Sequence, residues 1–230
     1  MSAFPTTRWT LILGARESPE AAAEAWRHLL STYWPPLYAF FRARGLSAAD
    51  ASDAVQSFAV ELLEREVVQQ LTPERGRLRG FLKVAADHFL LRQHEKATAA
   101  KRGGPGARPL ELDASLGERL ADPSLSPEQA FERAWAMSIF DRALAALEQE
   151  WGSRAGSFEI IRLFFSPAAE PPGYREIAAK YALSIPQLKS LLHRARLRFR
   201  ELVEAEVRQT VGDAAELDLE VASLLGSLSA

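Results

Sequence analysis

Apolar residues recur along this chain at the three- and four-residue intervals of α-helices, whereas no stretch shows the strict alternation of a β-strand. Segments with the helical interval begin near Pro19, Ser47, Leu78, Ser126 and Tyr174. Between the third and fourth of these segments, Gly, Pro and Ser dominate and the periodicity disappears, which is typical of a linker. The sequence therefore predicts an all-α fold with two small helical domains joined by a flexible linker, the second containing a helix-turn-helix.

The predicted boundaries follow from where the helical pattern starts and stops. We expect a first helical domain over residues 1–97, a linker over 98–126, a second helical domain over 127–206 and an acidic amphipathic tail over 207–230. The apolar stripe of the tail favours packing on the domain that precedes it. The alternative is that the apolar stripe of the tail folds back over the basic helix and limits DNA binding until it is displaced.

Within the first domain, prolines and capping residues place the helix ends. Pro19 is expected to open a helix that Pro35 and Pro36 interrupt, and an aromatic-rich core follows. Ser47 is expected to cap the next helix, whose exposed side is acidic. A further helix, with a mostly basic surface, is expected to run from about Leu78 to Lys96.

The stretch that ends at Arg200 has the pattern of two short helices around a tight turn, the second helix being basic. Ser184 and Gln187 form a capping box that predicts where the second helix begins. Ala182 stands where such a turn commonly carries glycine, so a positive φ there would cost about 1 kcal/mol. Apolar residues of the second helix fall at helical intervals and predict one buried stripe, made of Leu188, Leu191, Leu192, Ala195 and Phe199.

Positive charge is concentrated on this second helix, although the whole chain has a net charge of only −2. Between Lys189 and Arg200 there are five Lys or Arg residues and no acidic residue. A charged stripe on an amphipathic helix is often only a solvated face. In combination with the turn and the cap, however, the uninterrupted positive charge favours binding to DNA phosphates.

Other kinds of chemistry find little support in the sequence. The chain has no cysteine, which excludes disulfides and thiolate metal sites. Its four histidines lack metal spacing and an arranged carboxylate or nucleophile, and no glycine-rich phosphate loop follows a strand. We therefore expect no enzymatic activity, no cofactor and no metal. The lack of a signal peptide and of a bilayer-spanning stretch predicts a cytoplasmic protein.

Three segments together resemble a known family. SAADASDAVQSFAVELLE is similar to the second-region helix of bacterial sigma factors of the extracytoplasmic-function type, and PERGRLRGFLKVAADHFLLRQHEK is similar to the promoter-melting helix that follows. YREIAAKYALSIPQLKSLLHRARLRFRE is similar to the fourth-region helix-turn-helix of that family, and the short C-terminal extension resembles an atypical branch. The resemblance implies a subunit that binds core RNA polymerase, recognises two elements of promoter DNA and helps melt the DNA between them, without catalysing a reaction.

The resemblance also implies roles for individual residues. On the helix that meets polymerase, the implied contacts are Asp50, Asp53, Gln56 and Glu61, although an ordinary solvated helix face would have the same pattern. The residues implied to contact the downstream element and the melted DNA are Arg75, Arg77, Arg79, Lys83, His88, Arg92 and Lys96. The residues implied to contact base edges of the upstream element are Gln187, Lys189, His193, Arg194 and Arg196. Arg198 and Arg200 are implied to bind phosphate there.

The partners and the regulation of such a protein leave alternatives open. A stand-alone helix-turn-helix regulator that never binds polymerase would also explain the second domain, and it would bind paired half-sites as a dimer. A sigma factor would instead be monomeric when bound to polymerase at one asymmetric promoter. Control could come from an inhibitory protein, or from a Ser/Thr kinase acting on Ser52 or Ser57, where relatives in the family commonly carry an acid or another residue.

Overall fold

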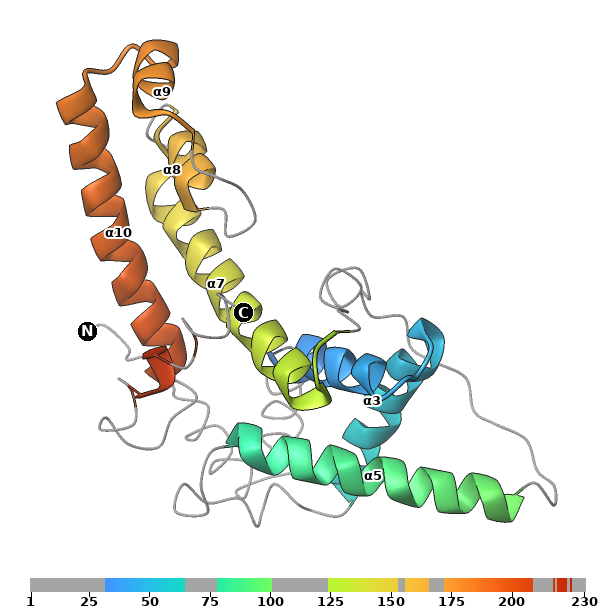
Figure 1. Ribbon diagram of the computed structural model, residues 1–230. Coiled ribbons are helices and arrows are strands. Elements are labelled where there is room, and N and C mark those ends of the chain that lie inside the picture. Colours follow the sequence, from blue (N-terminus) through green and yellow to red (C-terminus); the bar gives the residue numbers. More distant parts are fainter. Residues whose placement is uncertain are drawn as a thin grey trace. The chain divides into compact units, whose positions relative to one another are not determined.

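The described part of the chain is built of helices joined by turns and contains no β-strand, which confirms the all-α prediction (Figure 1). A computed structural model describes residues 32–64, 78–100, 124–152, 156–165, 172–208, 217, 219–222 and 224. The helices are residues 32–43, α3 (Ala48–Glu64), α5 (Leu78–Ala100), α7 (Pro127–Trp151), α8 (Ser157–Phe165), α9 (Tyr174–Lys180) and α10 (Ile185–Arg208), with helical residues again at 217, 219–222 and 224. None of these helices combines the length and the apolar character that crossing a membrane requires.

Contacts divide the chain into two compact units. The first unit comprises Met1–Ser138 together with Arg208–Ala230, and the second comprises Ile139–Val207. The division falls inside α7, so this helix contributes its first part to one unit and its second part to the other. Most of the expected linker, residues 101–123, lies outside the described residues, and the predicted domain boundaries stay a prediction.

Three aromatic rings form the centre of the first unit. Phe41 of helix 32–43, Phe58 of α3 and Phe89 of α5 are buried, and their ring centroids are 5.5 to 6.2 Å apart. Edge-to-face pairs of this kind stabilise a core beyond the burial of their area, by about 0.5–1.5 kcal/mol each. One aromatic residue from each helix thus fixes how the three helices of this unit pack together.

Two sequence expectations about helix ends in the first unit had different outcomes. Ser47 caps α3 as predicted: its hydroxyl accepts a hydrogen bond from the Asp50 amide at 3.1 Å and donates one to the Asp50 carboxylate at 2.6 Å. The predicted interruption at Pro35 and Pro36 is wrong, because both prolines lie within helix 32–43. Proline keeps a helical φ but forfeits its amide hydrogen bond and crowds the carbonyl four residues earlier, costs that burial of neighbours such as Tyr38 offsets here.

The second unit is held by two apolar clusters on either side of α8. One cluster joins α7, α8 and α10 and consists of Leu147, Trp151, Phe158, Ile161 and Ala195. The other joins α8, α9 and α10 and consists of Ile160, Ile177, Ala178, Leu188 and Leu192. Helix α8, which the sequence analysis did not single out, therefore supplies the surface on which α9 and α10 are held.

The C-terminal segment of the chain belongs to the first unit. Leu217, Glu220 and Leu224 are buried, whereas Leu219 is exposed. The expectation that the tail packs on the domain preceding it is therefore wrong. The chain leaves the first unit inside α7, builds the second unit and then returns to the first, because the apolar stripe of the tail has its buried neighbours there.

Candidate nucleic-acid interface

The connection between α9 and α10 is a tight turn whose geometry follows from its hydrogen bonds. The Leu183 amide donates to the Ala178 carbonyl at 2.8 Å, and the Ala182 amide donates to the Ala179 carbonyl at 3.3 Å. This pair of bonds is the Schellman pattern, which requires a left-handed residue just past the helix. Ala182 has that conformation, with φ of 51°. The turn therefore stores about 1 kcal/mol of strain that glycine would not have.

The start of α10 is fixed by the predicted capping box. The Ser184 hydroxyl accepts a hydrogen bond from the Gln187 amide at 3.3 Å, and the Gln187 side chain accepts one from the Ser184 amide at 2.8 Å. Each bond satisfies an amide that a helix leaves without an intrahelical partner. The first turn of α10 is consequently ordered, and the direction of the side chains that follow is set.

One face of α10 is buried as the sequence predicted. Leu188, Leu192 and Ala195 are buried, and Leu191 and Phe199 are half-buried against the same clusters. This stripe holds the helix against α7, α8 and α9 (Figure 1). The opposite face is thereby presented to solvent.

The exposed face in the leading half of α10 carries the residues that were predicted to reach DNA bases. These residues are all exposed, and they are Gln187, Lys189, His193, Arg194 and Arg196. No ion pair found within the described ranges involves any of them. Three of the five are Lys or Arg, so this surface can displace the counterions of a nucleic-acid backbone. We call these five residues the α10 basic face.

The trailing half of α10 has its charges paired with carboxylates. The Arg198 guanidinium donates to both carboxylate oxygens of Glu150 on α7, at 2.8 and 2.6 Å, and to Glu201 at 2.6 Å. Arg200 donates to Glu204 one turn further along, at 2.8 Å. The two residues predicted to hold phosphate are therefore engaged within the second unit, and Arg198 would have to exchange a bidentate carboxylate for a phosphate.

The Arg198–Glu150 pair shifts the proton affinity of both groups. Hydrogen bonding to the Arg198 guanidinium lowers the pKa of the Glu150 carboxyl below its ordinary value. Hydrogen bonding to Glu150, and then to Glu201, raises the pKa of Arg198. Both groups are partly exposed, so solvent screens the interaction and its contribution to stability is small.

A different arrangement is found in the first unit at α5, the second candidate DNA-binding helix. Arg79 is 5% exposed, and its guanidinium donates to Glu132 of α7 and to Glu220 of the C-terminal segment. The guanidinium carbon also lies 3.8 Å from the ring centroid of Trp135. Lys83 donates to the other oxygen of Glu132 at 2.6 Å. Two predicted DNA contacts, the buried Arg79 and the half-buried Lys83, are thus engaged by carboxylates of the protein.

The remaining candidates for the downstream element differ in their surroundings. The Arg92 guanidinium donates to Glu61 of α3, so a residue expected to face DNA and one expected to face polymerase contact each other instead. His88 is exposed on α5. Arg75 and Arg77 lie outside the described residues, as does the side chain of Lys96.

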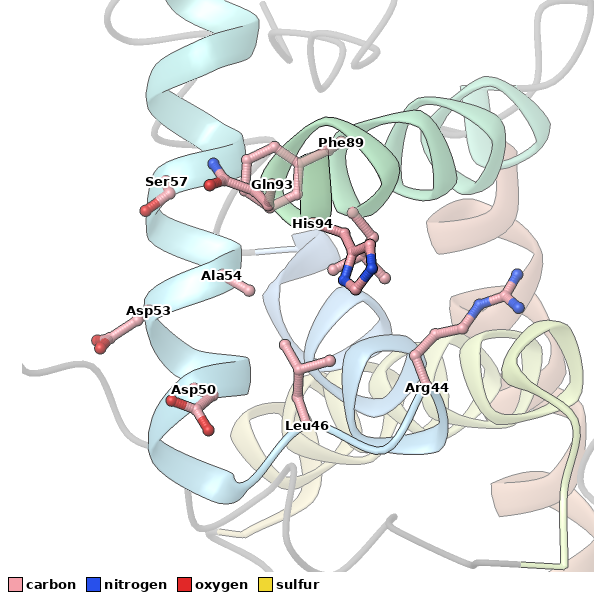
Figure 2. Close-up of a pocket in the computed structure, with 10 residues that line it drawn as sticks. Arg44, Leu46, Asp50, Asp53, Ala54, Ser57, Phe89, Gln93 and His94 are labelled. Carbon is pink, nitrogen blue, oxygen red and sulfur yellow. The ribbon is translucent and has the colours of Figure 1, made fainter. Parts of the chain in front are cut away.

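An open pocket of about 630 Å³ lies between α3, α5 and the turn after helix 32–43 (Figure 2). Its lining combines apolar residues such as Leu46 and the buried Phe89 with Arg44 and His94, while Asp50 and Asp53 stand on the α3 side. Asp53 points outward from α3, and both carboxylates are exposed. Gln56, by contrast, is half-buried. The arrangement can accept an apolar side chain of a protein partner while the carboxylates meet a basic one.

Sequence reasoning found the cations of these surfaces but missed the acids that engage them. Glu132, Glu150 and Glu220 were not among the candidates, and each contacts an arginine at least 48 positions away in the chain. No local pattern marks such a pair. The only available signal is helical phase, which places Glu132 next to the buried helical face that includes Trp135.

Comparison of the chain with protein-family models, with curated proteins and with solved structures found no match. The resemblance to sigma factors accordingly rests on the three sequence segments quoted above, and family membership stays a prediction.

Proposed function

We propose that this protein is a sigma factor that binds core RNA polymerase and directs promoter recognition and transcription initiation. In this proposal it acts in the cytoplasm, contacts promoter DNA through α10 and α5, and catalyses nothing itself. It is monomeric when bound to polymerase, because an asymmetric promoter offers one site for each recognition surface. No cofactor or metal takes part.

The observation that carries the proposal is the α10 basic face on a helix that follows a short helix and a tight turn. We interpret α9, the turn and α10 as a helix-turn-helix. Lys189, His193 and Arg196 recur at four- and three-residue intervals, so they lie along one side of the helix. A major groove is about 12 Å wide and admits one α-helix. The leading turns of α10 can therefore enter the groove with these side chains directed at base edges.

The polymerase-binding part of the proposal is supported by the exposed side of α3. Asp50 and Asp53 are exposed next to an apolar pocket, a combination that suits a protein partner with basic and apolar groups. Charges of this kind contribute more to the rate and specificity of association than to its affinity. Glu61 is engaged with Arg92, so we assign it the role of orienting α5 against α3.

The proposal is tested by retention of the protein on purified bacterial core RNA polymerase, followed by run-off transcription from a pool of genomic upstream fragments. We expect retention, and transcripts that appear only when the protein is added. The double variant Asp50→Asn, Asp53→Asn should associate with polymerase more slowly and be retained less than the unchanged protein. Glu148→Gln is the matched control, because it removes an exposed carboxylate from α7 in the second unit and should leave retention unchanged.

The same experiment separates this proposal from the stand-alone regulator. A regulator would bind specific DNA fragments without being retained on polymerase, and it would do so as a dimer on paired half-sites. DNA binding with no retention would thus overturn the sigma-factor proposal. Retention that the Asp50→Asn, Asp53→Asn variant does not weaken would overturn the role of α3 alone.

A further inference from the structure

The buried charge cluster at the start of α5 is built from three separate parts of the chain. Arg79 comes from α5, Glu132 and Trp135 come from α7, and Glu220 comes from the C-terminal segment. Among the described residues, these contacts join two cations, Arg79 and Lys83, with two carboxylates, Glu132 and Glu220. Glu220 is 1% exposed, which means that its carboxylate has exchanged water for the Arg79 guanidinium. A carboxylate is removed from water only where a partner of this strength replaces the solvent.

The C-terminal segment carries Glu220 to this place on an amphipathic turn of helix. Leu217 and Leu224 flank it and are 8% and 2% exposed, whereas Leu219 between them is 63% exposed. The segment thus has a buried side that includes the carboxylate and a solvent side that does not. Local release of a segment costs less free energy than unfolding of the whole core.

We propose that the C-terminal segment is an internal competitor of DNA for Arg79. The inference takes from the proposed function that α5 faces single-stranded promoter DNA. Arg79 donates to Glu220 through one guanidinium nitrogen, and a phosphate oxygen can accept from the same nitrogen, so Glu220 occupies the position that a backbone phosphate would take. While the segment is docked, Arg79 is unavailable to DNA; when it leaves, Arg79 gains a binding role. Because binding is reciprocal, DNA that uses Arg79 must favour release of the segment by the same factor.

Release of the segment can be measured directly, because the chain has no cysteine of its own. Single substitutions Leu217→Cys and Leu224→Cys place a thiol on the buried side, and Leu219→Cys places one on the exposed side of the same segment. We expect a maleimide reagent to modify the two buried thiols more slowly than the exposed one. A mixed-sequence single-stranded DNA oligonucleotide should then accelerate both buried positions by about fivefold or more, at the lower end of typical coupling between sites, and leave Leu219→Cys unchanged.

A second measurement uses the affinity for the same oligonucleotide across a range of salt concentrations. Glu220→Gln keeps the size of the side chain but removes the charge that competes with phosphate. We expect tighter binding, and a dependence of log affinity on log salt that is steeper by about 0.7, the value for one additional phosphate contact on a single strand. Leu219→Ala is the matched control in the same segment and should change neither quantity.

Each outcome decides the inference. Equal modification of all three thiols without DNA would overturn the docking, since two independent buried positions report on it. Protected thiols that DNA does not accelerate, or an unchanged salt dependence in Glu220→Gln, would show that the segment is only part of the core. If the protein is retained on polymerase but DNA does not release the C-terminal segment, this inference alone is refuted. If DNA releases the C-terminal segment but the protein is not retained on polymerase, the proposed function is refuted and the competition for Arg79 still holds.

Discussion

The helices α5 and α10 are both basic in sequence, but the structure uses their charges in opposite ways. On α5, Arg79 and Arg92 contact carboxylates of other elements, located 141 and 31 positions away in the chain. The leading half of α10 instead presents the α10 basic face to solvent. A run of positive residues therefore shows how much charge a helix carries. Whether that charge is available to an external partner depends on where acidic residues from distant parts of the chain are placed.

The same contrast recurs within α10 itself. Its leading half is free of acidic residues, whereas Glu201, Glu204 and Glu206 follow in the trailing half and Glu150 approaches from α7. Arg142 of α7 donates to Glu206 at 2.8 Å, so the trailing half is attached to α7 through charges of both signs. One helix thus combines a surface for an external partner with an anchor for its own unit.

The largest effect is expected from removing the buried cation. Arg79→Ala leaves Glu132 and Glu220 without the guanidinium between them, and breaking a buried pair in this way costs about 3–5 kcal/mol. Chemical denaturation followed by tryptophan fluorescence measures the loss, since Trp135 contacts Arg79. Arg194→Ala on the exposed face of α10 should stay within about 0.5 kcal/mol of the unchanged protein. Similar losses of unfolding free energy in both variants would contradict the difference between α5 and α10.

The next largest effect concerns DNA binding by the two halves of α10. Arg196→Ala removes an exposed contact and should weaken specific binding by about 1–3 kcal/mol. Arg198→Ala should weaken it less, because Arg198 is already engaged with Glu150 and Glu201. Fluorescence anisotropy on a promoter fragment identified by run-off transcription gives both values. An equal loss of DNA affinity in the two variants would mean that Arg198 leaves Glu150 and Glu201 when DNA binds.

A smaller effect is expected from the pH dependence of the anchor. Because the pKa of Glu150 is lowered in the folded protein, its pair with Arg198 stabilises the fold above the ordinary pKa of 4.5. That contribution is lost as the pH falls from 4.5 through the lower folded pKa. Its size is below about 1 kcal/mol for a partly exposed pair. Glu150→Gln should flatten the fall in stability over this acidic range, whereas Glu148→Gln should not; thermal melts at several pH values compare them.

The smallest effect is expected at the turn before α10. Ala182→Gly removes the steric strain of the positive φ but adds conformational freedom to the unfolded chain, so the net stabilisation should be below about 1 kcal/mol. Thermal unfolding measures it, with Ala179→Gly inside α9 as a control that should destabilise the protein. Stabilisation by both substitutions would contradict the strain at Ala182.

Local features of the fold could be predicted from the sequence, because they depend on residues close together in the chain. The cap at Ser47 and the capping box of Ser184 and Gln187 are confirmed, and Ala182, where such a turn commonly carries glycine, has a positive φ. Each depends on hydrogen bonds or steric contacts spanning a few residues. The buried stripe of α10 could be predicted for the same reason, since helical periodicity alone determines it.

Features that depend on tertiary packing could not be predicted in this way. The break at Pro35 and Pro36 was expected from local preference, but burial of the aromatic residues around them outweighs that preference. Arg79 was assigned to DNA through the family resemblance, and only the approach of Glu132 and Glu220 explains its burial. The exposed candidates on α10 remain predictions about DNA, and those on α3 remain predictions about polymerase.

The return of the C-terminal segment to the first unit also affects the order of events during protein synthesis. The ribosome adds Glu220 141 positions after Arg79. At about 5–20 residues per second, Arg79 therefore waits on the order of ten seconds for its second carboxylate. Throughout that interval the nascent first unit lacks the Arg79–Glu220 contact and the buried side chains of Leu217 and Leu224. Newly made chains thus pass through a stage in which Glu132 is the one carboxylate of this cluster that has been synthesised.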